Sequence, residues 1–379
     1  MIVGEFLQWM ETAPAGQRAD AAAALARTYL YSEVDDETRS DIEAALTVAL
    51  DDEWADVRFA LADALGASEM APRHIVIALA ADQVEIATIV LSRSPIFIDA
   101  ELVDIVAAAS GPLQLAVASR PAISGAVAAS IAEVGERDAC AALIVNSGAA
   151  IARVSYRRIA ERFGDDGEIR EALLGRELLP AEVRQLLIHS VTEALGGMAI
   201  AKAWMPENRV RAITRDACDR ATVAIAAETE TEDLPALVEH LRVTGQLTTS
   251  LLLRAVCAGN IPLFETALSA LARVPQHRVA ALMRANRLSG MRAIYARAGL
   301  PVVAFDGFTA ALDTWRRLSA EDMPADRYRF TMEMVEAVLS RYADISEGDA
   351  NELAAMLRRF AADQAREAAR DYAREIVAA

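Results

Sequence analysis

The feature that most constrains the fold is a repeat that runs from about residue 51 to residue 174. Each pass is a short apolar helix, a polar or proline-marked turn and a second short apolar helix. Comparable stretches lie at residues 52–61, 82–91, 111–118 and 147–154. Their spacing of roughly 30 to 37 residues is near the period of arrays in which each helical hairpin covers the apolar face of the next. The pattern predicts an all-α protein with an α-solenoid of helical hairpins, followed by a C-terminal helical region.

The regular spacing fades after Leu174. One helix is predicted over residues 180–196, where the Gly196-Gly197 pair is typical of a helix C-terminus. A longer helix is predicted from about residue 208 to residue 230. No convincing strand is found, and residues 301–305 are the nearest candidate. We therefore predict two domains, an N-terminal helical-repeat domain over residues 1–200 and a C-terminal all-helical domain over residues 201–379.

Charge is distributed unevenly along a chain of net charge −17. Residues 1–150 hold 23 acidic and 8 basic side chains, whereas residues 151–379 hold 32 and 30. The acidic half should repel nucleic acid and anionic membrane surfaces, so nucleic acid is an unexpected partner. No apolar run is long enough to span a membrane, and the first ten residues lack the basic region of a signal peptide.

The cysteines indicate a reducing compartment. Cys140, Cys218 and Cys257 are odd in number, far apart and set among apolar helical residues, so they are expected to be buried free thiols. We expect a cytoplasmic location.

Several stretches resemble a known family. They lie at residues 29–46, 72–82, 91–95 and 251–260. Residues 21–190 in particular are similar to a bacterial family known as a domain of unknown function and described as having HEAT-like helical repeats. The resemblance implies a soluble helical-repeat protein with no established activity, and it supplies no catalytic residues.

No motif for catalysis or for metal or cofactor binding is found. The chain has no serine elbow, no phosphate-binding glycine loop and no histidine pair at metal-binding spacing. The four histidines are scattered along the chain. An isolated histidine has no neighbouring group that would adjust its pKa for catalysis or hold it as a metal ligand. We predict no catalytic residues, no metal and no cofactor, and therefore no enzyme. An enzyme acting on a small molecule in a cleft between the two halves stays open as a third class; a deep polar pocket with convergent ionisable groups would favour it.

An acidic cluster is the first candidate binding surface. It consists of Asp51, Asp52, Glu53 and Asp56. These carboxylates would select a basic surface on a protein partner. In the structural alternative, Asp51-Asp52 ends one helix and Asp52 caps the helix that follows. A calcium site is disfavoured, because the cluster lacks the ligand spacing and central glycine of a calcium loop.

An arginine-rich segment is the second candidate. Residues 266–305 contain no acid, and their arginines are Arg273, Arg278, Arg284, Arg287, Arg292 and Arg297. If these side chains share one face, they would bind phosphate, a nucleic-acid backbone or an acidic protein surface. The favoured alternative is that they pair with acids of neighbouring helices or of the N-terminal array. A second group, Arg153, Arg157, Arg158 and Arg162, spreads over about half the circumference of one helix and is interpreted as a solvated face.

These observations predict a non-enzymatic scaffold or adaptor that binds a protein partner, in regulation or assembly, because helical-repeat proteins use their long surfaces for partners. The alternative is a phosphate- or nucleic-acid-binding protein that uses residues 273–297. The last predicted helix, residues 347–377, carries an apolar stripe of Leu353, Leu357 and Phe360 and later Tyr372 and Ile376. It could pair with a second copy to form a homodimer, although packing on its own domain is favoured.

Overall fold

The structure is a computed structural model. It describes residues 8–10, 12–285, 287–320, 327–342 and 349–378. Within these ranges the chain is helical throughout, apart from turns and one isolated parallel bridge between Ile123 and Ala149. The prediction of an all-α protein is confirmed. The chain forms two compact units, Met1–Leu179 and Pro180–Ala379.

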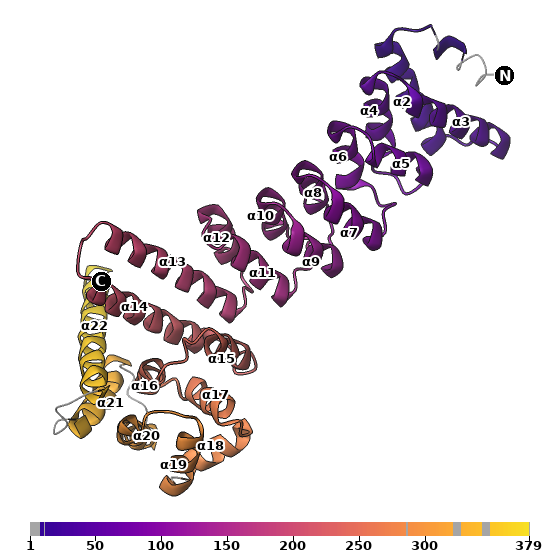
Figure 1. Ribbon diagram of the computed structural model, residues 1–379. Coiled ribbons are helices and arrows are strands. Elements are labelled where there is room, and N and C mark those ends of the chain that lie inside the picture. Colours follow the sequence, from indigo (N-terminus) through magenta and orange to yellow (C-terminus); the bar gives the residue numbers. More distant parts are fainter. Residues whose placement is uncertain (1–7, 11, 286, 321–326, 343–348, 379) are drawn as a thin grey trace. The chain divides into compact units, whose positions relative to one another are not determined.

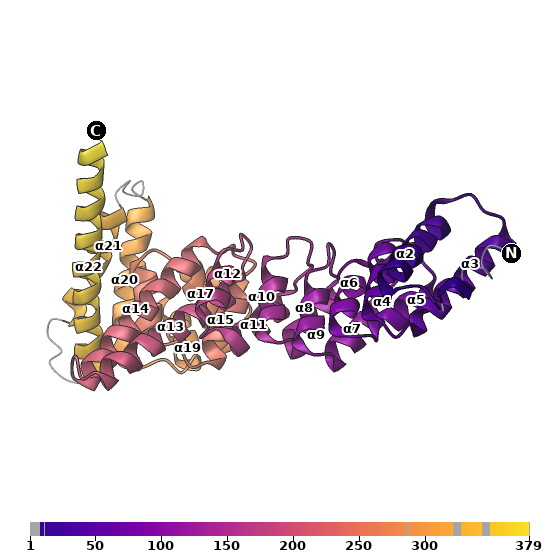
Figure 2. The same ribbon diagram turned by 90° about the horizontal axis from the view of Figure 1, so that it is seen from above.

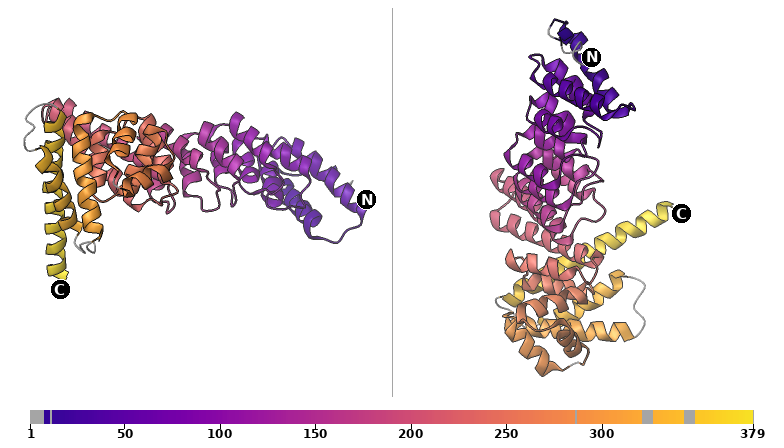
Figure 3. Two further views of the ribbon diagram at one scale, coloured as in Figure 1. Left: turned by 90° about the horizontal axis from the view of Figure 1, so that it is seen from below. Right: turned by 90° about the vertical axis from the view of Figure 1, so that its right-hand side faces the viewer.

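The first unit consists of two rows of helices (Figures 1 and 2). One row contains α2 (Ala15–Tyr31), α4 (Ala55–Leu65), α6 (Val84–Arg93), α8 (Gly111–Ala118), α10 (Arg137–Val145) and α12 (Gly167–Leu174). The other contains α3 (Asp36–Val48), η1 (Ala49–Asp51), α5 (Arg73–Ala80), α7 (Asp99–Ala108), α9 (Gly125–Val134) and α11 (Arg153–Phe163). In the first row each helix packs on the next of that row, and α7, α9 and α11 do the same in the second. Both views of Figure 3 show this succession from indigo to magenta.

Apolar spacing explains why these short helices stack. In α4, Val57, Leu61 and Leu65 are four residues apart and fully buried. That interval places them on one face of the helix. Burial of each such side chain contributes roughly 1.5–3 kcal/mol, which no hairpin obtains without a neighbour.

Side chains also clamp the C-terminal ends of successive helices in the first row. Arg120 donates hydrogen bonds to the carbonyls of Leu91 and Ser94, both at 2.6 Å. Asn146 donates to the Arg120 carbonyl at 2.7 Å, and Arg176 donates to the Asn146 carbonyl at 2.9 Å. The terminal carbonyls of a helix have no intrahelical donor, so these contacts satisfy groups that would otherwise be buried without a partner. The clamps recur along the row with each added hairpin.

The second unit surrounds one buried helix, α16 (Thr249–Cys257). The other helices are α13 (Ala181–Ala201), α14 (Glu207–Glu228), α15 (Leu234–Val243), α17 (Ile261–Ala272), α18 (Gln276–Arg284), α19 (Leu288–Arg297), α20 (Val302–Ala320), α21 (Arg327–Tyr342) and α22 (Asp349–Ala378). Every residue from 251 to 257 is buried, and α16 packs against α14, α17, α20, α21 and α22. The Phe264 and Phe308 rings stack beside it in the core, with centroids 4.9 Å apart.

Two predictions about elements were wrong. Helix α13 does not end at the Gly196-Gly197 pair but continues to Ala201. A Cβ at Gly196 would lie 2.9 Å from Cγ2 of Thr214 on α14, so this glycine allows close packing of two helices instead of ending one. Residues 302–305, part of the nearest strand candidate, form the first turn of α20.

The compact units divide at Leu179/Pro180, whereas the predicted division stands at 200/201. The difference is helix α13, which packs on α14 and therefore belongs to the second unit.

Candidate functional site

The acidic cluster separates into one structural residue and three exposed ones. Asp52 accepts two hydrogen bonds from Arg18 of α2, both at 2.8 Å, and one from the backbone N–H of Trp54 at 2.9 Å. Burial opposes ionisation of Asp52, but these hydrogen bonds outweigh it and hold the pKa below its usual value. Arg58 and Asp82 repeat the contact between α4 and the start of α6. Asp52 thus ties stacked helices together. It does not cap α4 as the structural alternative proposed, because the N-cap of α4 is Trp54 and has no side-chain cap hydrogen bond, but it directly follows η1, which ends at Asp51.

Asp51, Glu53 and Asp56 are exposed, and none makes an ion pair with any residue that the structure describes. Two exposed aromatic side chains lie within a few positions of them in the chain, Trp54 at 56% and Phe59 at 46% exposure. We call these five residues the α4 entry surface. It combines negative charge with apolar area at the start of one helix.

All six arginines of the segment 273–297 are exposed. Within the described ranges none of them makes an ion pair. The predicted pairing with acids of neighbouring helices is met in one weaker form, because Arg284 opposes the rise that burial causes in the pKa of Glu265 on α17. Arg278 and Arg284 are six residues apart and therefore point about 120° apart around α18. Arg292 of α19 lies over the Phe305 ring of α20 at 5.0 Å. The arginines are distributed around the α18–α19 hairpin and do not share one face of either helix.

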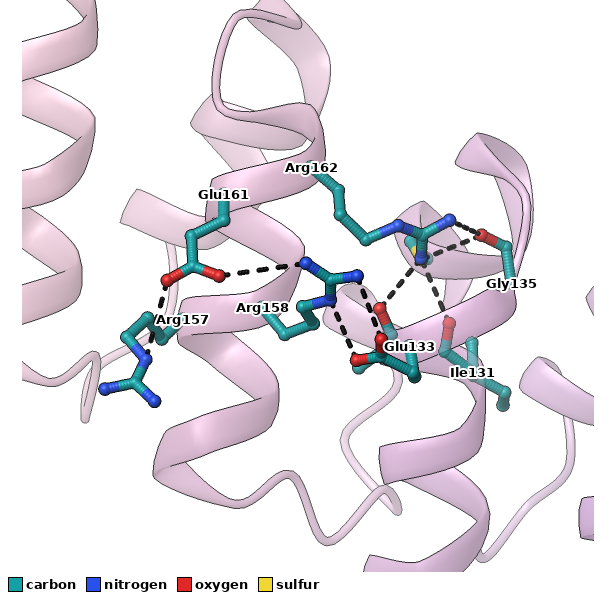
Figure 4. Close-up of polar contacts among 9 residues, drawn as sticks. Ile131, Glu133, Gly135, Arg157, Arg158, Glu161 and Arg162 are labelled. Atoms are coloured by element: carbon teal, nitrogen blue, oxygen red, sulfur yellow. Dashed lines mark hydrogen bonds and ion pairs between the residues drawn. The ribbon is translucent and has the colours of Figure 1, made fainter.

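Two of the four arginines of α11, Arg158 and Arg162, contact the neighbouring helix α9, whereas Arg153 and Arg157 are exposed, as expected of a solvated face (Figure 4). Arg158 forms two hydrogen bonds with Glu133 of α9, at 2.8 and 2.9 Å. Arg162 donates to the carbonyls of Ala132 and Gly135, at 2.8 and 2.7 Å, and so caps the C-terminal end of α9. These contacts hold two neighbouring helices of the second row together.

The thiols and imidazoles do not form a reactive site. All three cysteines are free and buried, and burial raises the pKa of each, to about 11 for Cys140 and to about 12 for Cys257. Such thiols stay protonated and unreactive. His74 is exposed and lies 2.9 Å from the Thr47 hydroxyl. In the described part of the chain, no three His, Cys, Asp or Glu side chains lie close enough to hold a metal ion.

A polar pocket of about 610 Å³ lies within the second unit. Helix α14 lines it with Asn208, Arg211, Ala212, Arg215, Asp216 and Asp219, the start of α16 with Thr248, Thr249 and Ser250, and α22 with Leu353, Ala355, Met356 and Arg359, beside Pro301. The three arginines are exposed and form its rim, whereas Asp216 and Asp219 are buried at its base. The volume is within the range of small-molecule sites.

A fully buried arginine lies behind the base of this pocket. Arg254 of α16 forms an ion pair with Asp216, and its guanidinium lies 4.9 Å from the centre of the Phe360 ring. Asp219 accepts a hydrogen bond from Ser250 at 3.1 Å. Burial raises the pKa of Asp219 to about 6, although Arg254 and Ser250 oppose the rise. The base therefore holds a carboxyl group that titrates close to neutral pH.

Sequence analysis missed the whole pocket. One signal was available: Asn208, Arg211, Arg215 and Asp219 follow intervals of three and four residues, which place polar groups on one stripe of α14. The other walls come from residues about 30 and 140 positions further along the chain, which no local pattern connects. All of the pocket's lining residues belong to the second unit.

The fold defines an all-α protein with stacked helical hairpins in its first unit and a polar pocket in its second. The model of a family described as "Uncharacterised protein conserved in bacteria (DUF2336)" matches residues 86–348, and the chain belongs to this family. No curated protein and no solved structure matches the chain. The predicted membership of a bacterial family of unknown function is confirmed. The resembling stretches at 91–95 and 251–260 lie inside the match, and those at 29–46 and 72–82 precede it.

Proposed function

We propose that this protein is a non-enzymatic, cytoplasmic adaptor whose first unit binds a partner protein through the α4 entry surface, in regulation or assembly. The observation that carries the proposal is the exposure of Trp54 and Phe59 among three carboxylates without ion-pair partners in the described ranges. Aromatic side chains are enriched at the centres of protein interfaces, where their burial dominates the binding energy. The surrounding carboxylates favour a basic surface on the partner and accelerate its association.

The charge of the whole first unit supports the same partner chemistry. Residues 1–179 contain 29 acidic and 14 basic side chains, a net charge of −15. Such a field attracts a basic protein over about 10 Å at ordinary ionic strength and repels nucleic acid. In the part of the chain that the structure describes, no helix has the length and apolarity needed to cross a membrane.

The first experiment is an affinity pull-down of the full chain from an extract of the source cells, with and without nuclease, followed by mass spectrometry. We expect discrete proteins to be retained after nuclease treatment. Retention that disappears with nuclease would contradict the proposal.

The captured partner is then titrated against three forms of the protein. In the Trp54→Ala/Phe59→Ala variant we expect at least about tenfold weaker binding, since each interface aromatic contributes more than about 1 kcal/mol. Reversal of charge at Asp51, Glu53 and Asp56 to Lys should weaken binding and reduce its salt dependence.

A matched control reverses Glu69, Asp104 and Glu171, which are exposed acids elsewhere in the same unit. Asp52 is left intact because it ties α2 to α4. Equal effects of the two charge reversals would show that net charge, not the α4 entry surface, determines binding.

A second candidate function is binding of a polyanion by the arginines of the α18–α19 hairpin. Their exposure, and the absence of ion pairs to described residues, favour it. Because the arginines surround the hairpin, they would supply a diffuse positive surface. Binding of a single-stranded oligonucleotide should then weaken steeply with salt and be lost in Arg278→Gln/Arg284→Gln/Arg287→Gln. No binding at low salt would rule this function out.

Self-association through α22 has less support. Leu353, Leu357 and Phe360, which form the predicted seam, are buried within the second unit. This part of the stripe is therefore already covered.

A further inference from the structure

The rim of the pocket in the second unit carries positive charge that the described residues leave largely uncompensated. Arg215 and Arg359 make no ion pair within the described ranges, and Arg211 pairs only with Glu207, one turn earlier on α14. Three guanidinium groups thus meet at one opening, although they come from helices about 140 residues apart in sequence. Arginine forks match the geometry of phosphate oxygens, which accept two parallel hydrogen bonds.

The carboxylates at the base compensate only part of this charge. Asp216 is bonded to the fully buried Arg254, and Arg220 lies 4.0 Å away on its other side. Asp219 is 7% exposed and accepts the Ser250 hydroxyl. Arg254 therefore compensates Asp216, whereas Arg215 lies close enough to Asp219 to oppose the rise in its pKa. Arg211 and Arg359 are not among the groups that act on the pKa of Asp219.

The start of α16 adds hydrogen-bond donors to the same pocket. The Thr248 side chain caps the helix by accepting from the backbone N–H of Leu251 at 3.2 Å. The other amides of the first turn have no intrahelical acceptor, and the positive end of the helix dipole favours an anion beside them. Thr249 and Ser250 line the pocket at this point.

The remaining walls are apolar. Leu353 and Met356 of α22, with Ala212 and Pro301, provide an apolar surface beside the arginines. The pocket of about 610 Å³ is far larger than a free phosphate ion requires and suits a drug-sized ligand. Its parts therefore match a molecule with a phosphate group, an apolar or planar body and a hydrogen-bond donor for Asp219.

We propose that this pocket binds a phosphate-bearing small molecule of nucleotide size. Arg215, Arg359 and the N-terminus of α16 hold the phosphate, and Asp219 accepts a hydrogen bond from a hydroxyl or amino group of the ligand. The site does not depend on the α4 entry surface, which belongs to the first unit. The adaptor would therefore bind its protein partner through the first unit and the small molecule through the second.

The test uses the full chain and three probes: ADP, inorganic phosphate and adenosine. Binding is measured by titration calorimetry and by the shift in thermal unfolding. We expect ADP to bind and to raise the melting temperature, and adenosine to bind much more weakly because it lacks the phosphates. Inorganic phosphate that binds as tightly as ADP would show that the pocket does not use the rest of the nucleotide and would overturn the assigned ligand size.

The decisive variant is Arg215→Gln/Arg359→Gln, which removes two exposed charges without an ion-pair partner in the described ranges. We expect at least about tenfold weaker binding of ADP, equivalent to the loss of one charge-assisted contact. The matched control, Arg341→Gln/Arg370→Gln, changes two exposed arginines of the same unit that do not line the pocket and should bind ADP as the natural chain does. Arg215→Lys/Arg359→Lys should restore part of the ADP affinity, because lysine keeps the positive charge but cannot donate two parallel hydrogen bonds to a phosphate group.

Three results would overturn the proposal. One is the absence of ADP binding at millimolar concentration, and another is equal affinity in the decisive variant and the natural chain. The third is equal weakening in the control, which would assign the binding to diffuse positive charge. Near-UV circular dichroism checks that each variant keeps its tertiary packing.

Discussion

At the scale of single residues, the structure of the second unit depends on a charge in its core. Arg254 lies in a run of seven buried residues and is itself 0% exposed. The sequence alone does not show that Arg254 is buried, because an arginine within an apolar helix more often lies at the surface with its aliphatic stem along the apolar face. The pairing with Asp216 comes from a helix 38 positions earlier. Tertiary contact alone makes the buried charge tolerable.

We predict that Arg254→Met destabilises the protein by about 3–5 kcal/mol, because it leaves Asp216 buried without its partner. Urea unfolding followed by circular dichroism measures the change. The double variant Arg254→Met/Asp216→Leu should recover much of the loss, since a buried ion pair can be replaced by apolar side chains. A single variant that loses less than about 1 kcal/mol, the range of surface pairs, would contradict the assigned role.

Asp219 is predicted to make stability depend on pH. Its pKa is raised to about 6, mainly by burial, from an ordinary value near 4 in the unfolded chain. The folded state therefore binds the proton more tightly. The stabilising contribution is complete below the unfolded pKa and is lost as pH rises through 6, by on the order of 3 kcal/mol.

Asp219→Asn should remove this loss, so that its free energy of unfolding relative to the natural chain rises between pH 5 and 7. The exposed Asp306→Asn serves as control. Parallel pH profiles for Asp219→Asn and the natural chain would refute the prediction.

At the scale of elements, sequence predicted two long helices of the second unit closely. The expected helix over residues 208–230 is α14, Glu207–Glu228, and the expected helix over 347–377 is α22, Asp349–Ala378. Apolar periodicity and proline positions are local signals, so they were sufficient there. They failed at Gly196-Gly197, because the reason for that glycine is a neighbouring helix. They failed for the pocket for the same reason: its walls are brought together only by tertiary packing.

The two adjacent glycines give a matched pair of variants. A Cβ at Gly197 would meet nothing within 4 Å, so Gly197→Ala should stabilise α13 by about 1 kcal/mol through helix propensity. A Cβ at Gly196 would lie 2.9 Å from the Thr214 methyl group, so Gly196→Ala should lose that gain or destabilise the protein. Denaturant unfolding compares them. Equal stabilisation by both would mean that α13 and α14 do not pack closely at Gly196.

At the scale of the whole molecule, the two units differ most in charge. The first has a net charge of −15, and residues 180–379, with 26 acidic and 24 basic side chains, have a net charge of −2. Self-repulsion destabilises a compact state, and salt screens it. The ion pairs that connect stacked helices, such as Arg18–Asp52, are short and partly buried, so salt screens them less than it screens the long-range repulsion.

We therefore predict that added salt stabilises the first unit selectively. Differential scanning calorimetry of the full chain, from low to physiological ionic strength, should show one unfolding transition that moves to higher temperature and one that barely moves. Two variants assign them: Arg120→Met removes the donor to the carbonyls of Leu91 and Ser94 and should lower only the salt-sensitive transition. Arg254→Met should lower only the other. If salt moves the transition that Arg254→Met lowers, or if both variants lower both transitions, then the repulsion is not confined to the first unit and the two units do not unfold independently.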